Sequence, residues 1–354
     1  MVILLLILLI ISLYGLKFTS FHKDYISLDS TNAIKGIFAV LILYSHMRQY
    51  LTLTDTFANN SYLVILNIIG QMMVTMYLFY SGYGLMESQR KKPNYKKEFP
   101  QKRLLKILLH FDIAVILYII LQFIIGNHYS ISEYAGSLIG WTSVGNSNWF
   151  IFVILVLYVF FYFSLCLEKF SAKGFMKKYE KEKTILMTVL FLCVFLWLLL
   201  YFIKGESRWI NNIMAFPLGV CYSMYRSKVE EQMNKGMCYY IVFLILTISL
   251  FAWRSFIGID KIGVCSCIFA LWTVLLSMKV KFNNIILHWL GTLAFPIFIL
   301  QRLPMIALTK MGVNQNVLLF VMIVIPLVLV ISHLYNWFLK KLDKELFAYT
   351  SNCK

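Results

Sequence analysis

The sequence predicts an all-α membrane protein, a polytopic transmembrane helical bundle of about 11 spans. Three observations predict this class. Hydrophobic residues make up 60% of the 354-residue chain, whereas a soluble domain has about half. The mean hydropathy is +0.75. The apolar residues also gather into runs of near twenty residues, which is the length that crosses a bilayer as a helix.

Eleven apolar windows are candidate spans. The first is short, but it lacks the basic start and the small-residue cleavage site of a secretory signal, so we expect it to be retained as a span. The seventh contains Pro217 and Gly219, which membrane helices tolerate where neighbouring helices satisfy the freed backbone groups. The windows lie at about 1–16, 32–47, 62–85, 104–125, 148–166, 184–203, 209–225, 237–253, 261–278, 289–309 and 316–338.

Lysine and arginine predict the orientation, because they collect in cytoplasmic loops. Five basic segments fall on one side when the spans are counted, and the opposite loops are poor in basic residues. The segments are 90–106, 169–183, 226–228, 279–281 and 340–344. We therefore expect an outside N-terminus and a cytoplasmic C-terminus. The net charge of +17 then indicates contacts with membrane lipids or anionic ligands, and no nucleic acid partner is expected.

The remaining composition indicates one integral domain in a plasma membrane. The seven cysteines show no metal-ligand spacing and no disulfide framework, so no metal is expected. No repeat or linker divides the chain. High lysine and isoleucine usage without a sorting signal favours a bacterial cell membrane, and assembly of the chain with itself is left open.

His46 is the candidate catalytic residue. It ends an apolar run that begins after Lys35, and at helical rise the two residues lie about 16 Å apart along the axis. An ionisable side chain held within a membrane usually faces a cavity lined by protein or water, which makes it a functional-site hypothesis. A histidine that only hydrogen-bonds a neighbouring helix is the alternative.

Other polar side chains also interrupt the apolar runs. Arg103 and Lys106 share a helix face and suit phosphate groups, although topology alone also explains them as flanking residues. Gln301 and Arg302 lie inside an apolar run, so Arg302 needs a partner or a watery lining. Asp112, within the fourth span, could pair with Arg302 or His46.

Five segments resemble the membrane acyltransferase-3 family. They are K-G-I-F-A-V-L-I-L-Y-S-H (35–46), Y-L-F-Y-S-G-Y-G-L-M (77–86), F-P-Q-K-R-L-L-K (99–106), N-S-N-W-F-I-F (146–152) and F-P-I-F-I-L-Q-R-L-P (295–304). The family has an Arg-Gly or Arg-Ala pair before a run ending in His, an F-F-x-L-S-G segment, an R-x-x-R element and a late helix containing His. The resemblance covers nearly everything after residue 30, and the order and spacing of the segments carry it.

The resemblance implies a membrane O-acyltransferase with no bound cofactor. Its co-substrate would be cytoplasmic acyl-CoA, with acetyl-CoA as the first candidate, and its acceptor a hydroxyl of a cell-surface polysaccharide, such as an exopolysaccharide, or of a lipid-linked sugar. His46 would act as general base or as transient acyl acceptor. The implied acyl-donor contacts are Lys35, Arg103, Lys106 and Arg302. The implied acceptor or cavity-lining residues are Ser81, Tyr83, Asn148, Trp149 and Gln301.

The implied organisation is a ten-span core over 31–339, preceded by an extra N-terminal span with its cytoplasmic connection (1–30) and followed by a cytoplasmic tail (340–354). The sequence departs from the family pattern at Lys35 and Lys106, where Arg is usual, at Asn32, often Asp, and at Gln301, which replaces the late His. These departures leave open the alternative that the protein is a non-catalytic member of a glycan-assembly complex. A transporter or flippase for a lipid-linked oligosaccharide or small solute is a further alternative, although no inverted repeat supports it.

Overall fold

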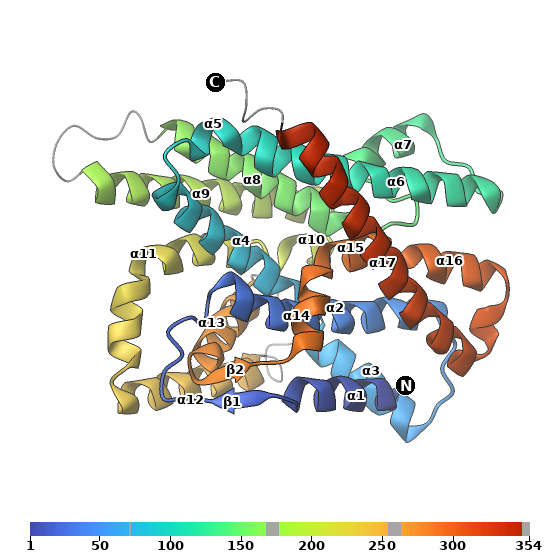
Figure 1. The fold of residues 1–354 in the computed structure, drawn as a ribbon, viewed down its shortest axis with the longest axis horizontal. Coiled ribbons are helices and arrows are strands. Elements are labelled where there is room, and N and C mark those ends of the chain that lie inside the picture. Colours follow the sequence, from blue (N-terminus) through green and yellow to red (C-terminus); the bar gives the residue numbers. More distant parts are fainter. Residues whose placement is uncertain (71, 168–176, 254–262, 349–354) are drawn as a thin grey trace.

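The computed structural model describes residues 1–70, 72–167, 177–253 and 263–348, and these form an almost entirely helical bundle (Figure 1). One two-stranded sheet joins β1 (Leu16–Phe18) to β2 (Val280–Phe282). The α-helices are α1 (Val2–Leu13), α2 (Leu28–Met47), α3 (Phe57–Ile69), α4 (Met72–Lys91), α5 (Tyr95–Phe99), α6 (Lys106–Ile124), α7 (Ile131–Leu138), α8 (Trp149–Leu167), α9 (Lys177–Ile203), α10 (Ser207–Ile210), α11 (Ala215–Met233), α12 (Gly236–Ala252), α13 (Val264–Lys279), α14 (Ile285–Thr292), α15 (Ala294–Leu300), α16 (Arg302–Lys310) and α17 (Val317–Ala348). Short turns of 3-10 helix cover Arg48–Tyr50 and Val313–Gln315, and a π-helical segment covers Pro100–Leu105.

A helix occupies each of the eleven predicted windows, but the prediction of 11 spans is not confirmed. Among the described residues, 5 helices are long and apolar enough to cross a membrane, or 7 if two bent helix pairs each count as one span. The 12-residue α1 is only about 18 Å long, and a bilayer core is about 30 Å thick. The five are Phe57–Lys91, Tyr95–Ile124, Trp149–Leu167, Glu180–Ile203 and Val317–Phe347.

The two bent pairs explain much of the difference. The helices Ser207–Met233 and Gly236–Ala252 meet at 117°, and Ile285–Thr292 meets Ala294–Lys310 at 57°. Pro296 and Pro304 lie in the second pair. Because proline has no N–H and its ring crowds the carbonyl four residues earlier, each interrupts the helical hydrogen bonds near a break. The predicted tenth span is therefore a broken helix.

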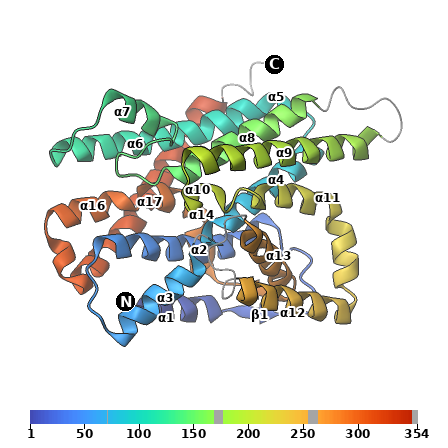
Figure 2. The same cartoon turned by 180° about the vertical axis from the view of Figure 1, so that it is seen from behind.

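The long helices are arranged in layers. In both views α6, α8 and α9 lie side by side in one outer layer, α1 and α12 lie in the opposite one, and α2 runs between them (Figures 1 and 2). The helices α4 and α17 cross these layers obliquely. Consequently, α2 is enclosed by other helices over most of its length, and its buried residues include Ala33, Phe38 and Leu43.

Two pairs of glycines allow the closest helix contacts. A Cβ atom on Gly36 of α2 would overlap the carbonyl oxygen of Leu287, and one on Gly291 of α14 would overlap that of Asn32. Likewise, Gly82 of α4 and Gly219 of α11 each lie against a backbone carbonyl of the other helix. Small residues let backbones approach in this way within membranes. These contacts hold α2 and α4, the helices that carry the candidate site, against α14 and α11.

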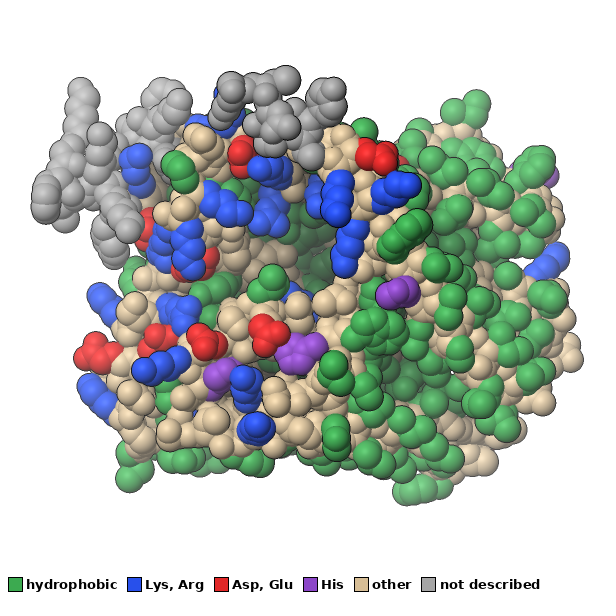
Figure 3. Space-filling model, viewed as in Figure 1, with side chains coloured by type: hydrophobic (Ala, Val, Ile, Leu, Met, Phe, Trp, Pro, Cys, Tyr) green, Lys and Arg blue, Asp and Glu red, His purple; other side chains and the backbone are tan. Residues whose placement is uncertain are grey.

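Charged side chains gather at one end of the long axis. On the face that Figure 3 shows, most basic side chains lie in the left and central parts, around a recess, whereas the right part is mainly hydrophobic. The same end carries the sheet, in which β1 and β2 pair antiparallel with Lys17 opposite Lys281. The N-terminal connection and the loop before α14 therefore lie on one face, as the charge pattern predicts.

Candidate functional site

An inner cavity of about 500 Å³ lies between α2, α4, α8 and α15. Lys35 and Arg103 line it, and so does a group of aromatic side chains that includes Tyr77, Tyr80 and Tyr158. The Tyr77 hydroxyl donates to the Lys35 carbonyl oxygen at 2.7 Å, which joins α4 to α2. The Lys35 ammonium lies 5.7 Å from the centre of the Tyr80 ring, within reach of a cation–π interaction. The cavity is thus mainly apolar, with two cationic groups.

An outer cavity of about 380 Å³ contains His46 in its lining. It is more polar than the inner cavity, because Ser45, Gln49, Asn67, Asn211 and Ser266 line it together with two arginines. Three side chains, Ile42, Val74 and Phe298, line both cavities. They therefore form a partition between the cavities, and we call these three residues the partition.

The imidazole of His46 lies directly beside the partition. Its ring centroid is 6.4 Å from that of Phe298, and Phe298 in turn packs edge-on against Phe150 at 5.3 Å. The side chain is half-buried, and its Nδ1 atom is buried without a hydrogen-bond partner among the described residues. Nδ1 is therefore turned away from solvent while the ring still reaches the outer cavity.

Gln301 is a neighbour of the His46 imidazole. It interacts with the imidazole, and it lies at the break between α15 and α16, where it is fully buried. Its Nε2 atom donates to the Phe298 carbonyl oxygen at 3.1 Å, but its Oε1 atom has no partner within the described part of the chain. A neutral imidazole protonated on Nδ1 could donate to this oxygen. Such a bond would leave Nε2 unprotonated and free to accept a proton.

A basic pocket of about 450 Å³ adjoins the inner cavity. Five basic side chains and two acidic ones line it, and Arg103 lines both this pocket and the inner cavity. The basic residues are Lys92, Lys102, Arg103, Lys106 and Lys344. Since cationic donors in such a cluster pair well with phosphate oxygens, the pocket suits a phosphorylated ligand whose apolar arm continues into the inner cavity.

Lys106 differs from Arg103 in its partners. Its ammonium forms a 2.6 Å ion pair with Asp343 of α17, and His110 Nε2 contacts the same carboxylate at 2.9 Å. The Tyr335 hydroxyl donates to the His110 carbonyl oxygen, with the bond again joining α17 to α6. Lys106 therefore fastens α17 to α6 at the rim of the basic pocket, as well as lining it.

Arg302 lies beside the outer cavity, away from the other predicted donor contacts. Its guanidinium donates to Gln49 Oε1 at 2.7 Å, to Ser147 Oγ at 3.2 Å and to Tyr50 Oη at 3.4 Å. Gln49 is 14 positions after Lys35 along the α2 direction, which is about 21 Å at helical rise. The structure therefore brings Lys35, Arg103 and Lys106 to two adjoining cavities and does not bring Arg302 with them. Asp112 contacts neither Arg302 nor His46: within the described ranges its buried Oδ1 has no partner.

The predicted acceptor or lining residues are dispersed. Trp149 lines the outer cavity and Ser81 the inner one, where the Tyr158 hydroxyl donates to Ser81 Oγ at 3.3 Å. Asn148 instead supports the preceding loop, since its Nδ2 donates to the Gly140 carbonyl oxygen at 3.0 Å. Tyr83 lines neither cavity.

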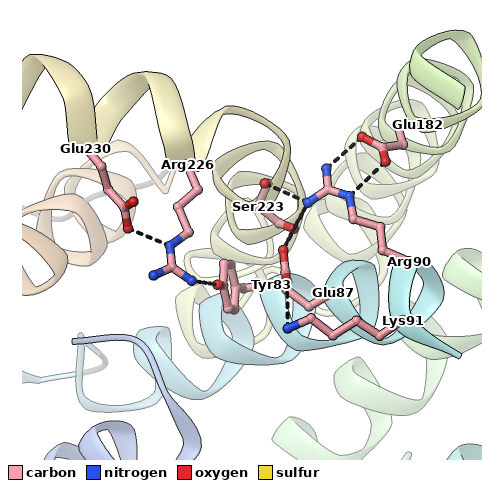
Figure 4. Close-up of polar contacts among 8 residues, drawn as sticks. All are labelled: Tyr83, Glu87, Arg90, Lys91, Glu182, Ser223, Arg226 and Glu230. Carbon is pink, nitrogen blue, oxygen red and sulfur yellow. Dashed lines mark hydrogen bonds and ion pairs between the residues drawn. The ribbon is translucent and has the colours of Figure 1, made fainter. Parts of the chain in front are cut away.

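Tyr83 belongs to a polar cluster between α4, α9 and α11 (Figure 4). Its hydroxyl accepts from Arg226 at 2.8 Å, and Arg226 also pairs with Glu230. Nearby, Arg90 forms a two-bonded ion pair with Glu182, with distances of 2.8 and 2.6 Å. These contacts join three helices at the basic end of the molecule, which gives Tyr83 a structural role.

The sequence interpretation missed the polar lining of the outer cavity. Arg48 and Gln49 lie two and three positions after His46, and their closeness to the candidate base was an available signal. Asn212 gave another, since it is a polar residue within an apolar window. Its Oδ1 atom accepts from Thr75 at 2.7 Å and from Ser266 at 2.8 Å, beneath the cavity. No cluster of three or more metal-ligating side chains occurs in the described ranges.

Comparison with known proteins identifies the family. No curated protein and no solved structure gives a significant match. A family model described as an acyltransferase domain matches residues 28–337, the region that contains α2 and its histidine, both cavities and most of α17. Since this match covers most of the chain, the protein is a member of the acyltransferase-3 family, and its domain is an acyltransferase domain.

Proposed function

We propose that the protein transfers an acyl group, with acetyl as the first candidate, from cytoplasmic acyl-CoA to a sugar hydroxyl at the outer face of a bacterial cell membrane. The acceptor is a cell-surface polysaccharide or a lipid-linked sugar. One observation carries the proposal: the basic pocket, the inner cavity and the outer cavity follow one another, and His46 lies beside the partition at the outer end.

The donor enters from the cytoplasmic side in this proposal. The phosphates of coenzyme A bind the basic pocket, with Arg103 at its junction with the inner cavity. The thioester arm then extends along the mainly apolar inner cavity toward the partition. Lys35 lies within that cavity, so it contacts the arm or its amide groups. The positive charge of the pocket supports entry of the donor from the cytoplasm, because basic residues collect on the cytoplasmic face of membrane proteins.

The reaction consumes a thioester and a hydroxyl and produces an ester and free coenzyme A. With His46 as general base, the imidazole takes the hydroxyl proton while the sugar oxygen attacks the thioester carbonyl. The C–S bond then breaks, and the proton passes to the departing thiolate. With His46 as acyl acceptor, the imidazole nitrogen attacks the thioester carbonyl first, the C–S bond breaks and the thiolate leaves. The sugar hydroxyl then attacks the acyl-imidazole, the bond between the acyl carbon and the nitrogen breaks, and the hydroxyl proton passes to the thiolate. Gln301 positions the imidazole in either route, because its Oε1 accepts a hydrogen bond from Nδ1–H.

The test uses purified full-length protein and radiolabelled acetyl-CoA, followed by mass analysis of surface glycan from cells with and without the intact protein. His46→Ala should lower acetyl transfer by at least about 100-fold, the usual contribution of a general base. The control is His128→Ala, since His128 is exposed on the loop after α6. Transfer at the normal level by His46→Ala protein that still accumulates in membranes would remove the assignment.

A carrier would also need a path that approaches the partition from both sides. Counterflow of a lipid-linked sugar or small solute across proteoliposomes, without any consumption of acetyl-CoA, would favour a transporter or flippase instead.

To distinguish the two catalytic routes, a single-turnover reaction without acceptor is quenched and the protein is digested. Label on His46 indicates the acyl-imidazole route.

A further inference from the structure

Three arginines surround the outer cavity on the acceptor side of the proposed reaction. Arg48 and Arg208 line it, and Arg302 contacts Gln49, which also lines it. Arg302 and Arg48 are both close enough to act electrostatically on His46. The acceptor side of the cavity is therefore strongly cationic, although the loops of this face are poor in basic residues.

Among the residues that the structure describes, two of these arginines are held only by neutral groups. Arg48 Nη1 donates to Asn67 Oδ1 at 2.7 Å. Arg302 donates to an amide oxygen and two hydroxyls, as described above. Within residues 1–70, 72–167, 177–253 and 263–348, no carboxylate forms an ion pair with either, whereas Arg208 pairs with Glu206. Both arginine residues are half-buried.

An arginine without a counter-ion is costly near a membrane, and such residues mark sites for ligands of opposite charge. The neutral partners fix the direction of each guanidinium but leave its charge uncompensated. A planar guanidinium binds carboxylate or phosphate through two parallel hydrogen bonds, which a neutral sugar cannot offer. Trp149, also in the lining, adds an apolar surface against which a sugar ring can pack.

We infer that the acceptor is an anionic glycan, and that Arg48 and Arg302 bind a carboxylate or phosphate on it next to the hydroxyl that receives the acyl group. The inference rests on the proposed function, because it names the acceptor class of the same site. The anion would hold the sugar so that its hydroxyl faces His46. The inference also gives the arginines different roles: Arg103 binds the donor phosphates, and Arg302 binds the acceptor.

The experiment measures binding of three soluble probes to the full-length protein in nanodiscs of neutral phosphatidylcholine. The probes are oligogalacturonate for carboxylate, glucose 1-phosphate for phosphate, and uncharged maltohexaose. We expect at least one anionic probe to bind about tenfold more tightly than maltohexaose. Arg48→Gln and Arg302→Gln should each weaken that binding about tenfold, the effect of one lost charged contact. The anionic probe that binds identifies the charged group of the acceptor as a carboxylate or a phosphate.

Lys310→Gln is the matched control, because it removes one positive charge from an exposed position at the end of α16. It should leave anion binding within twofold. A fold check comes from acetyl-CoA binding, which uses the opposite end of the molecule. Arg48→Lys should restore part of the binding, since it keeps the charge but loses the two-bonded geometry.

Three results would overturn the inference. The first is equal binding of charged and uncharged probes, and the second is an equal loss of binding in Lys310→Gln. The third is that neither soluble anion binds and that only added phosphatidylglycerol binds at the two arginines, which would identify a lipid headgroup as their partner. Acetyl-CoA consumption by the unaltered protein is measured separately. If it is absent, the proposed function fails whatever the anion result; if it is present without preferential anion binding, only this inference fails.

Discussion

Gln301→Leu tests the link between the two unpartnered buried atoms beside the partition. The substitution keeps the approximate volume of the side chain but removes Oε1, the atom that we propose accepts a hydrogen bond from His46 Nδ1–H. During proton abstraction the imidazole becomes charged, so this hydrogen bond strengthens in the transition state. A hydrogen bond to a charged group contributes about 1.5–3 kcal/mol. At about 1.4 kcal/mol per tenfold, kcat should fall about 10- to 150-fold.

The assay follows radiolabelled acetyl transfer at saturating acceptor and compares kcat with the KM for acetyl-CoA. The KM should stay within about twofold, because Gln301 lines neither the basic pocket nor the inner cavity. Gln301→Glu retains an acceptor oxygen at the same length and should restore most of kcat. This recovery separates positioning of the imidazole from general support of the fold, since it depends on the acceptor atom.

Gln122→Leu is the matched control. Gln122 is also a buried glutamine, its Nε2 donates to the Val144 carbonyl oxygen at 3.0 Å, and neither residue lines a cavity of the site. Its replacement also removes a buried hydrogen bond, but kcat should change less than twofold. The reasoning is refuted if Gln301→Leu keeps the normal kcat in folded protein, or if Gln122→Leu lowers kcat equally.

Two further predictions concern the donor side and the helix packing. Arg103→Ala should weaken acetyl-CoA binding about tenfold in a titration of the purified protein, because it removes a charge-assisted contact. Lys97→Ala should leave the affinity unchanged, because Lys97 is an exposed neighbour outside the basic pocket. An unchanged affinity in Arg103→Ala would mean that this arginine only marks the topology. Gly82→Ala should destabilise the protein by about 1–3 kcal/mol, because the added methyl overlaps the Phe216 carbonyl. Gly84→Ala meets nothing within 4 Å and should melt at the normal temperature, so equal melting of both variants would contradict the packing argument.

Apolar periodicity and length predicted where helices lie, and the structure has a helix in each window. They could not predict how many helices are long enough to span, because that depends on breaks. Leu293 and Gln301 interrupt one window, and the sharp turn after Met233 joins α11 to α12. A hydropathy window averages over such breaks and therefore counts a bent pair in the same way as straight spans.

For the site, the sequence predicted how far along a helix a residue lies better than it predicted which neighbours its side chain contacts. The position of His46 at the far end of α2 from Lys35 follows from helical rise alone, and the cavities lie accordingly. The side from which another helix reaches α2 is not encoded locally. Arg302 could therefore be given a donor role from sequence although it lies beside Gln49, and Tyr83 could be given a cavity role although it contacts Arg226.

The short sheet has a consequence for any shortened form of the protein. The matched family region begins at residue 28, yet the preceding residues are fastened to the helix that supports α2. Asn284, at the start of α14, donates from Nδ2 to the carbonyl oxygens of Ile11 and Tyr14 at 2.7 and 3.2 Å, next to the β1–β2 pairing. Removing the first 27 residues would expose one edge of β2 and deprive Asn284 of both acceptors. Residues 1–27 thus support α14 and, through it, α2, and a chain shortened to the family boundary should lose rigidity around Lys35.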